Sequence, residues 1–593
     1  MDNFFKYLYI ILSLIGGLAL FLYGMDLMGD GLKKLAGGKL ESILAKLTSS
    51  RLKGLLLGLG VTAVIQSSSA TTVMLVGFVN SGIMKLGQTI SVIMGANIGT
   101  TVTAWLLTTN DIPETAGNII KLFKPSSFTP VLAIIGLLMI MTAKNDRKKN
   151  AGSILIGFAI LMFGMDAMSN AVDGLGDSLN SILLMFKNPI IGIVVGMIFT
   201  AIIQSSSASV GVLISFALAP SVSLPYSIAL PLLLGMNIGT TITPIISSIS
   251  GNVNAKRVAF SCLSIKMIGV TVVTASFYII HAISPFAFME TSATAVGVAF
   301  AHTLFNIIST VILVPFCKPL EKLAVVTIKA KKTDIEEENV FAVLDDRFLD
   351  MPSFAVEKAK ELVCQMAEIS NDSFIMATSL LDKYDEATFN KVKKLEARVD
   401  KYEDKISTYL VKVAENQIAA KESRVVTELL HCIGDIERIS DHALNIAEVA
   451  EEIHEKKIDF SESAKADIKV ITAAVTEVLE IAISSMVNDD LGIAKRVEPL
   501  EQVIDRLKRK IKNGHINRLR QGDCTMELGF ILSDLLTNYE RIADHCSNIA
   551  VCFIEMSHDS FETHEYLNNL KSGGEESEFR EMYQEYKAKY YME

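Results

Sequence analysis

A run of four hydrogen-bonding side chains occurs twice in the chain, as Gln-Ser-Ser-Ser-Ala at residues 66–70 and again at residues 204–208. Each copy is flanked by long apolar runs that are typical of membrane segments. In hydrocarbon every polar group needs a partner, so such a cluster faces other protein or a water-filled cavity and commonly marks the path of a substrate or ion. Serines that only join neighbouring helices are the alternative. The second copy favours a binding site.

The chemistry of these side chains suits a small anion together with a small cation. Serine hydroxyls and free backbone N–H groups at a helix break can donate to an oxyanion, while hydroxyl, amide and carbonyl oxygens can replace the water shell of sodium. The predicted anion ligands are Ser67, Ser68, Ser69, Ser205, Ser206, Ser207, Thr100 and Thr240. The predicted sodium ligands are Gln66, Gln204, Asn97, Asn237, Thr101 and Thr241.

Two other motifs repeat at nearly the same distance. Residues 22–26 recur at 162–166, and the Gly-x-Asn-Ile-Gly-Thr-Thr-x-Thr motif at 95–103 recurs at 235–243. With the serine motif, the offsets are 140, 138 and 140 residues. Three motifs in one order at so constant a spacing indicate an internal repeat, which we place at about residues 14–108 and 152–250. The glycines of the longer motif allow either backbone unwinding or close approach of another helix.

Charge indicates that the two repeats are oppositely oriented. The segment 33–53, after the first span, carries six Lys or Arg against Glu41, whereas its counterpart 172–189 carries Asp173 and Asp177 against Lys187 alone. Short cytoplasmic loops are enriched in Lys and Arg, so the two loops should lie on opposite sides of the membrane.

The parity of the spans supports this interpretation. A second basic loop at residues 144–149 belongs on the same side as the first, yet three apolar segments (about 54–82, 87–108 and 128–143) separate the two. One segment must fail to cross, and the one containing Gln66 is the candidate, as a re-entrant hairpin or broken helix. Inverted repeats with interrupted helices are the build of many secondary transporters.

Few ionisable residues lie inside the predicted spans. Asp26 and Asp166 fall near helix ends, where a role at the membrane interface and a role in binding are both open. Lys266 and His302 are candidate charge partners, although a snorkelling lysine and a hydrogen-bonded histidine inside the bundle are the simpler interpretations.

The chain divides into two halves of different composition. Residues 1–317 hold 18 Lys and Arg and 11 Asp and Glu (net +7), and residues 318–593 hold 37 and 54 (net −17), which together give the net charge of −10. We predict a transmembrane domain at 1–317, a charged linker at 318–351, a helical domain at 352–556 and a charged tail of unassigned function at 557–593. The apolar run 7–28 has no cleavage site and is expected to be retained as a helix. Seven scattered cysteines form no redox or zinc motif, and the acidic balance excludes nucleic acid as an expected partner.

The soluble half contains its own repeat. Residues 437–447 recur at 540–550, an offset of 103, and a Glu-x-x-x-Asp spacing occurs in four matched places. Residues four apart share a helical face, so each pair can present two carboxylates to one point. The predicted metal ligands are Glu396, Asp400, Glu437, Asp441, Glu501, Asp505, Glu540 and Asp544. A solvated acidic face is the alternative.

The paired Gln-Ser-Ser-Ser and Asn-Ile-Gly-Thr-Thr motifs resemble the sodium/phosphate cotransporter family, specifically its bacterial branch, over about residues 14–317. This resemblance implies that inorganic phosphate is the anion and that sodium is the coupling ion. The Glu-Arg-Ile-x-Asp-His-x-x-Asn repeats resemble the PhoU family over about residues 352–556. That resemblance implies two three-helix bundles side by side, with a divalent or iron-type metal on the acidic pairs.

We therefore expect an all-α membrane protein with inverted repeats and broken helices, which carries a PhoU-like pair of bundles in the cytosol. The expected function is sodium-coupled phosphate transport across the cytoplasmic membrane, without enzymatic activity and with a second copy of the chain as a candidate partner. A phosphate exporter or relief valve and a membrane-anchored phosphate sensor are the alternatives. A sensor would be expected to carry a degraded motif in one repeat, and both motifs are intact.

Overall fold

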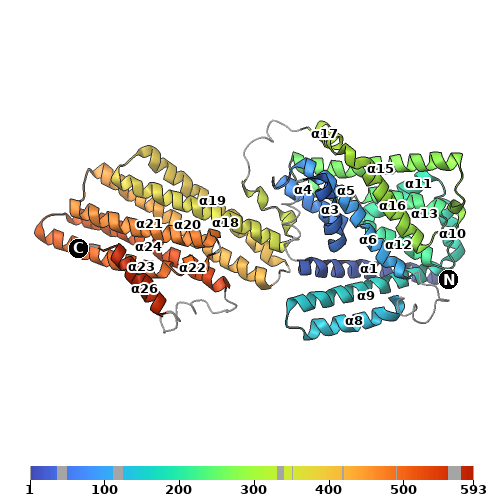
Figure 1. Cartoon of the computed structure of the whole chain (residues 1–593), viewed down its shortest axis with the longest axis horizontal. Coiled ribbons are helices and arrows are strands. Elements are labelled where there is room, and N and C mark those ends of the chain that lie inside the picture. Colours follow the sequence, from blue (N-terminus) through green and yellow to red (C-terminus); the bar gives the residue numbers. More distant parts are fainter. Residues whose placement is uncertain are drawn as a thin grey trace. The chain divides into compact units, whose positions relative to one another are not determined.

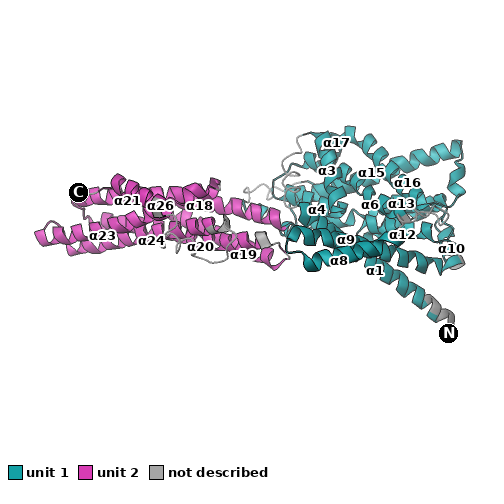
Figure 2. Ribbon diagram, turned by 60° about the horizontal axis from the view of Figure 1, so that its bottom comes forward, with its two compact units in different colours: residues 1–351 teal, residues 352–593 magenta. Residues whose placement is uncertain are grey.

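The computed structural model describes residues 2–36, 50–110, 125–329, 340–349, 351–416, 418, 420–488, 490–557 and 576–591. Over these residues the secondary structure is helical apart from turns and one isolated β-bridge, which confirms the predicted all-α class. The chain forms two compact units, residues 1–351 and 352–593, which Figure 2 distinguishes by colour.

The first unit contains both long helices, such as α1, α9 and α15, and short ones (Figure 1). Its helices are α1 (Asp2–Ala36), α3 (Arg51–Ile65), α4 (Ser68–Asn80), α5 (Leu86–Gly99), α6 (Thr101–Leu107), α8 (Pro125–Thr142), α9 (Asp146–Asp173), α10 (Gly176–Leu184), α11 (Pro189–Ile203), α12 (Ser206–Leu218), α13 (Tyr226–Gly239), α14 (Ile242–Ser248), α15 (Val253–Ile283), α16 (Ala295–Leu313) and α17 (Cys317–Thr327). Within the described residues, six stretches of this unit are long and apolar enough to cross a membrane: 8–36, 86–107, 146–173, 226–248, 253–283 and 295–327.

Helices α1 and α9 pack side by side and antiparallel (Figure 1). Three glycines of α1 approach α9 in reverse order along the chain: Gly17 meets Gly164, Gly24 meets Gly157, and Gly31 meets Asn150. A Cβ on Gly24 would lie 2.3 Å from the Leu161 nitrogen, so the two backbones touch. The end of α1 therefore lies beside the beginning of α9, and the last residues of the two helices lie at opposite ends of the pair. This geometry confirms the predicted inversion of the repeats.

Glycines also allow α3 to pack closely against α5 and α11 to pack closely against α13. A Cβ on Gly58 of α3 would lie 2.1 Å from the Val92 carbonyl oxygen of α5, and a Cβ on Gly196 of α11 would lie 2.2 Å from that of Leu232 in α13. On the opposite side of each contact, Gly95 and Gly235 meet backbone carbonyls of α3 and α11 in the same way. These glycines of the repeated motif therefore serve close helix packing.

The second unit consists of two helical bundles. Its helices are α18 (Pro352–Asp382), α19 (Glu386–Glu415), α20 (Ala420–Lys456), α21 (Glu462–Asn488), α22 (Leu491–Ala494), α23 (Val497–Gln521), α24 (Met526–Ser557) and α26 (Glu576–Lys589). Helices α18, α19 and α20 form one bundle, α21, α23 and α24 form the other, and α20 packs against α24. The predicted pair of three-helix bundles is confirmed. Helix α21 is also apolar enough to cross a membrane, but its residues Ile471, Val475 and Leu479 are buried within this unit.

Two predictions about the connecting segments need correction. The stretch 318–351, predicted as a charged linker, contains most of α17, which packs against α5 and α15, and a folded segment at 340–349. The charged tail at 557–593 contains α26, which packs against α23 and buries Tyr586. In both stretches a few apolar side chains, Leu320, Phe348 and Tyr586 among them, are buried although the average composition is polar. Residues 37–49 of the predicted basic loop, 330–339 of the linker and 558–575 of the tail lie outside the described residues.

Candidate functional site

Each Gln-Ser-Ser-Ser motif breaks a helix with the same backbone geometry. Gln66 ends α3 at φ 60° and ψ 18°, and Gln204 ends α11 at φ 61° and ψ 16°. This left-handed conformation is uncommon for a residue with a Cβ. The next serine caps the following helix, since Ser67 accepts a hydrogen bond from the Ala70 N–H at 3.1 Å and Ser205 accepts one from the Ala208 N–H at 3.2 Å. The predicted interruption at both motifs is confirmed.

The helices on either side of each break are short. α3 and α11 have 15 residues each, and α4 and α12 have 13. At a rise of about 1.5 Å per residue they extend about 20 Å, which is less than the roughly 30 Å of a bilayer core. Each motif is therefore the junction of two half-length helices.

The two junctions meet at one cavity of about 360 Å³. Its wall consists of residues 65–69, residues 203–207 and one face of α1 that carries Asp26, Asp30 and Lys33. Ser69 Oγ donates to the Gln204 carbonyl oxygen at 3.4 Å across the junctions. The first N–H groups of a helix lack intrahelical partners and carry partial positive charge, so the N-termini of α4 and α12 suit this cavity for an anion.

Thr103 links the two motifs behind the cavity wall. Its hydroxyl donates to Gln66 Oε1 at 2.8 Å and accepts from Ser207 Oγ at 3.4 Å. The amide of Gln66 also donates to the Ala63 carbonyl, and the side chain is buried. Sequence reasoning missed Thr103, although it is the last residue of the repeated motif at 95–103.

The other predicted ligands do not line the cavity. Four of their hydroxyls donate to backbone carbonyls within one helical turn, at 2.7 to 2.9 Å: those of Thr100, Thr101, Thr240 and Thr241. The amide of Asn237 donates to the Leu233 carbonyl at 3.0 Å, and Asn97 is half-buried. These residues lie at the junctions of α5 with α6 and of α13 with α14. The structure therefore brings together the two Gln-Ser-Ser-Ser motifs and leaves the Asn and Thr residues behind them.

The second repeat differs from the first in its side chains. Gln204 is exposed where Gln66 is buried. Thr243, the counterpart of Thr103, has a buried hydroxyl that finds no hydrogen-bond partner in the part of the chain that the structure describes, and the same holds for Thr200. A buried hydroxyl without a partner is unfavourable, so these two oxygens are candidate ligands.

The structure contradicts the simpler interpretation of Lys266 and shows no hydrogen bond for His302 among the described residues. Lys266 does not snorkel: it lies on the face of α15 that packs against α13, is 8% exposed, and donates from Nζ to Thr240 Oγ1. His302 is 1% exposed, and among the described residues neither ring nitrogen has a hydrogen-bond partner. A buried amino group therefore lies beside the helix junction of the second repeat. Asp26 lines the cavity and Asp166 does not.

In each bundle of the soluble half, the two predicted acidic pairs lie close to each other. The pair on α19 faces the pair on α20, and the pair on α23 faces the pair on α24, close enough to repel one another. Burial, followed by neighbouring carboxylates, raises the pKa of Glu437 to about 7 and that of Glu501 to about 8. No three His, Cys, Asp or Glu side chains of the described residues are arranged to hold a metal ion. Lys508 forms an ion pair with Glu540.

The His and Asn residues of the soluble repeat join its two bundles. In α24, His545 and Asn548 contact Asp435 of α20 at 2.7 and 3.1 Å. The mirror contacts join His442 and Asn445 of α20 to Asn538 of α24, at 2.8 and 3.3 Å. The histidines stack with ring centroids 5.7 Å apart, and burial lowers the pKa of His442. Sequence reasoning noted the motif but not this role.

Comparison with known families matches both halves. The Na+/Pi-cotransporter family matches residues 20–170 and 172–301, and the PhoU domain matches residues 363–450 and 468–552. The membrane half of the chain is a Na+/Pi-cotransporter domain, and the soluble half carries a PhoU domain. Each family matches twice, in agreement with the two internal repeats. The Na+/Pi-cotransporter half makes the chain a multi-pass membrane protein.

Individual relatives share one or both halves. YjbB of Salmonella typhimurium, whose name assigns it provisionally to inorganic phosphate export, is 23% identical over 565 residues, which are 94% of this chain and 99% of that protein. Phosphate-specific transport system accessory protein PhoU homolog 1 of Thermotoga maritima is 28% identical over 226 residues, 36% of this chain and 95% of that protein. Sodium-dependent phosphate transport protein 2A of Rattus norvegicus is 39% identical over 93 residues, 15% of this chain and 14% of that protein.

Proposed function

We propose that the chain is a sodium-coupled transporter of inorganic phosphate in the cytoplasmic membrane, regulated by its PhoU half from the cytosol. The observation that carries the proposal is the convergence of two serine-rich helix N-termini, those of α4 and α12, on one cavity. Such a site offers hydroxyl and backbone donors from two directions to a tetrahedral oxyanion.

Phosphate binds between the two junctions. Ser68 and Ser69 donate from the first repeat and Ser206 and Ser207 from the second, together with the N–H groups of the first helical turns. Lys33, which pairs with Asp30 at 3.7 Å on the cavity wall, adds positive charge at the α1 side. Ser67 and Ser205 act by capping the two helices.

Sodium binds beside the phosphate and offsets its charge. The predicted amide ligand Gln204 is exposed on the cavity wall, and Asp26 and Asp30 supply carboxylates there. Thr243 adds a buried hydroxyl oxygen that has no hydrogen-bond partner among the described residues. Because each ion lowers the electrostatic cost of binding the other, sodium raises the affinity for phosphate and phosphate raises the affinity for sodium by the same factor. This reciprocity couples the two fluxes.

Export is the second candidate direction. The name of YjbB, which has the same two-part architecture, favours outward movement of phosphate. One alternating-access site serves either direction, and the sodium and phosphate gradients decide which way it runs. The divalent or iron-type metal proposed for the acidic pairs of the PhoU half would neutralise clustered carboxylates in either case.

The deciding experiment measures labelled phosphate in sealed proteoliposomes, with a sodium gradient imposed in each direction in turn. We expect phosphate to follow sodium in both orientations and to stop when choline replaces sodium. The matched control is Ser69→Ala combined with Ser207→Ala, which should reduce the flux in both orientations. If wild-type protein moves no phosphate under any gradient, the proposed function is wrong.

A further inference from the structure

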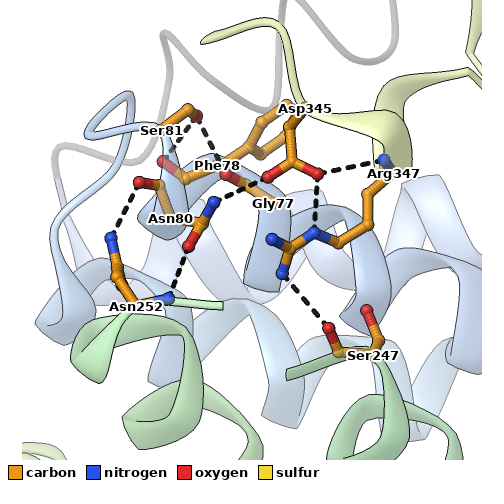
Figure 3. A network of polar contacts seen from close by, with 8 residues as sticks. All are labelled: Gly77, Phe78, Asn80, Ser81, Ser247, Asn252, Asp345 and Arg347. Carbon is orange, nitrogen blue, oxygen red and sulfur yellow. Dashed lines mark hydrogen bonds and ion pairs between the residues drawn. The ribbon is translucent and has the colours of Figure 1, made fainter. Parts of the chain in front are cut away.

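The segment Asp345–Phe348 lies directly before the PhoU half but belongs to the membrane unit, where it contacts the last turn of α4 (Figure 3). The Phe348 side chain is fully buried and packs on the Phe78 ring, with centroids 5.6 Å apart. A Cβ on Gly77 would lie 2.8 Å from the Phe348 ring. The absence of a side chain at Gly77 therefore leaves the space on α4 that the ring occupies. We call this segment the linker clamp.

Polar contacts fix the linker clamp to α4. Asp345 accepts from Asn80 Nδ2 at 2.7 Å through one carboxylate oxygen and from Arg347 Nε at 2.7 Å through the other (Figure 3). The side chains of Asp345 and Arg347 are only 6% and 15% exposed. Charged hydrogen bonds shielded from water are stronger than those of an exposed ion pair.

The same network reaches the second repeat. Arg347 Nη1 donates to the Ser247 carbonyl at the end of α14, at 3.3 Å. Asn80 accepts from the Asn252 N–H at 2.8 Å, and its carbonyl accepts from Asn252 Nδ2 at 2.9 Å, at the beginning of α15 (Figure 3). The linker clamp therefore holds the end of α4 against the end of α14 in the second repeat and against the beginning of α15.

Helix α4 connects the linker clamp to the cavity. Its first residues, Ser68 and Ser69, line the cavity, and its last turn, Gly77–Asn80, holds the clamp. A continuous helix of 13 residues is a rod of about 20 Å, so a shift at one end moves the other. The clamp comes from the chain beyond both repeats, so it is not part of the repeated pattern.

We propose that the linker clamp is the mechanical connection through which the PhoU half controls the cavity. While the clamp is seated, α4 is held against α14 and α15 and the first junction cannot rearrange. A conformational change in the PhoU half pulls on the chain at Pro352, four residues after Phe348. The linker clamp then loses its contacts with α4, and α4 moves. The inference rests on the proposed function only in taking this cavity as the transport site.

The test uses the full-length chain in proteoliposomes and two release variants, Phe348→Ala and Arg347→Ala. The control is Asp346→Asn, which removes the charge of an exposed carboxylate within the same segment. A cysteine at Ser69, labelled with a water-soluble thiol reagent, reports on the cavity end of α4, with the parent chain and its native cysteines as the blank. In the Ser69→Cys background we expect both release variants to raise the labelling rate several-fold, and in chains that keep Ser69 we expect them to raise the phosphate flux several-fold. The control should leave both quantities within twofold.

A locked variant tests the opposite direction. Asn80→Cys combined with Asp345→Cys, cross-linked by a short thiol reagent cleavable by reduction, should stop most of the flux, and reduction should restore it. The inference is overturned if labelling at position 69 is unchanged in both folded release variants, or if the cross-linked protein transports at the rate of the reduced one. If wild-type protein moves no phosphate, the proposed function fails, while the labelling rate still decides whether the clamp controls α4.

Discussion

Gln66 and Gln204 end their helices with nearly the same backbone angles, but only Gln66 buries its side chain. Gln66 is bonded to Thr103, whereas the hydroxyl of Thr243, the counterpart of Thr103, has no partner among the described residues. The first repeat also carries the linker clamp on α4. The local motif therefore determines the backbone break in both repeats. The surrounding helices determine whether the glutamine side chain is buried and hydrogen-bonded.

This difference is what one conformation of an inverted-repeat transporter should show. When such a protein changes the side to which its site opens, the two repeats exchange their environments. We therefore expect Gln204 to become buried against Thr243, and Gln66 to become exposed, in the conformation that opens to the other side.

The largest effect should come from the glycines that both repeats use alike. Gly58→Ala and Gly196→Ala each place a Cβ near 2 Å from a backbone carbonyl, so each should destabilise the fold by about 3 kcal/mol or more. Gly60→Ala is the matched control, because no atom lies within 4 Å of its Cβ position. Yield and thermal unfolding in detergent measure the effect. If either Gly58→Ala or Gly196→Ala had wild-type stability, the two repeats would not be structurally equivalent at these contacts.

Substituting the two glutamines should destabilise the protein to different extents in the two repeats. Gln66→Ala removes buried hydrogen bonds and leaves Thr103 without its acceptor, which should cost about 1 to 3 kcal/mol of unfolding free energy. Gln204→Ala, at an exposed position, should cost less than about 0.5 kcal/mol. Both should shift the sodium concentration that half-activates transport. Equal losses of stability would mean that the two side chains occupy equivalent environments on average.

Lys266→Met tests the buried amino group beside the junction of α13 with α14 in the second repeat. Replacing a buried lysine with an apolar side chain of similar length is commonly neutral or stabilising, so thermal stability should be unchanged or higher. The sodium activation curve should shift, because the hydrogen bond that Lys266 donates to Thr240 is lost. Lys256→Met, at an exposed position near the start of the same helix, is the control. A Lys266 variant with wild-type sodium activation would show that this amino group has no part in cation binding.

The PhoU half extends the comparison to a second pair of repeats. Its raised carboxyl pKa values stabilise the fold only at low pH, and this contribution is lost as pH rises through about 7 for Glu437 and about 8 for Glu501. Amide hydrogen exchange in the full chain, measured from pH 4.5 to 9 with rates corrected for pH, should show both bundles loosening as pH rises, with the loss levelling off near pH 7 in the first bundle and near pH 8 in the second. Manganese should flatten both profiles if the acids hold metal. Identical profiles with and without metal would favour a solvated acidic face.

The sequence predicted the inverted repeats, the broken helices and the paired bundles because each depends on a repeated local pattern. The shared backbone of residues 66–70 and 204–208 followed from their repetition alone. The opposite states of Gln66 and Gln204, the partner of Thr103 and the burial of Lys266 depend on contacts between distant helices, which periodicity does not reveal. The linker clamp and α26 were missed because Phe348 and Tyr586 are single apolar residues in charged surroundings.

The central claim is that both Gln-Ser-Ser-Ser motifs hold one phosphate. The direct measurement is a double-mutant cycle on the sodium-dependent affinity for phosphate, with Ser68→Ala, Ser206→Ala and the double variant. Each single change should weaken binding by about 1.5 to 3 kcal/mol, roughly one to two decades. Because both hydroxyls donate to the same anion, the two losses should be coupled by at least about 0.5 kcal/mol. Wild-type affinity in the double variant would contradict the account.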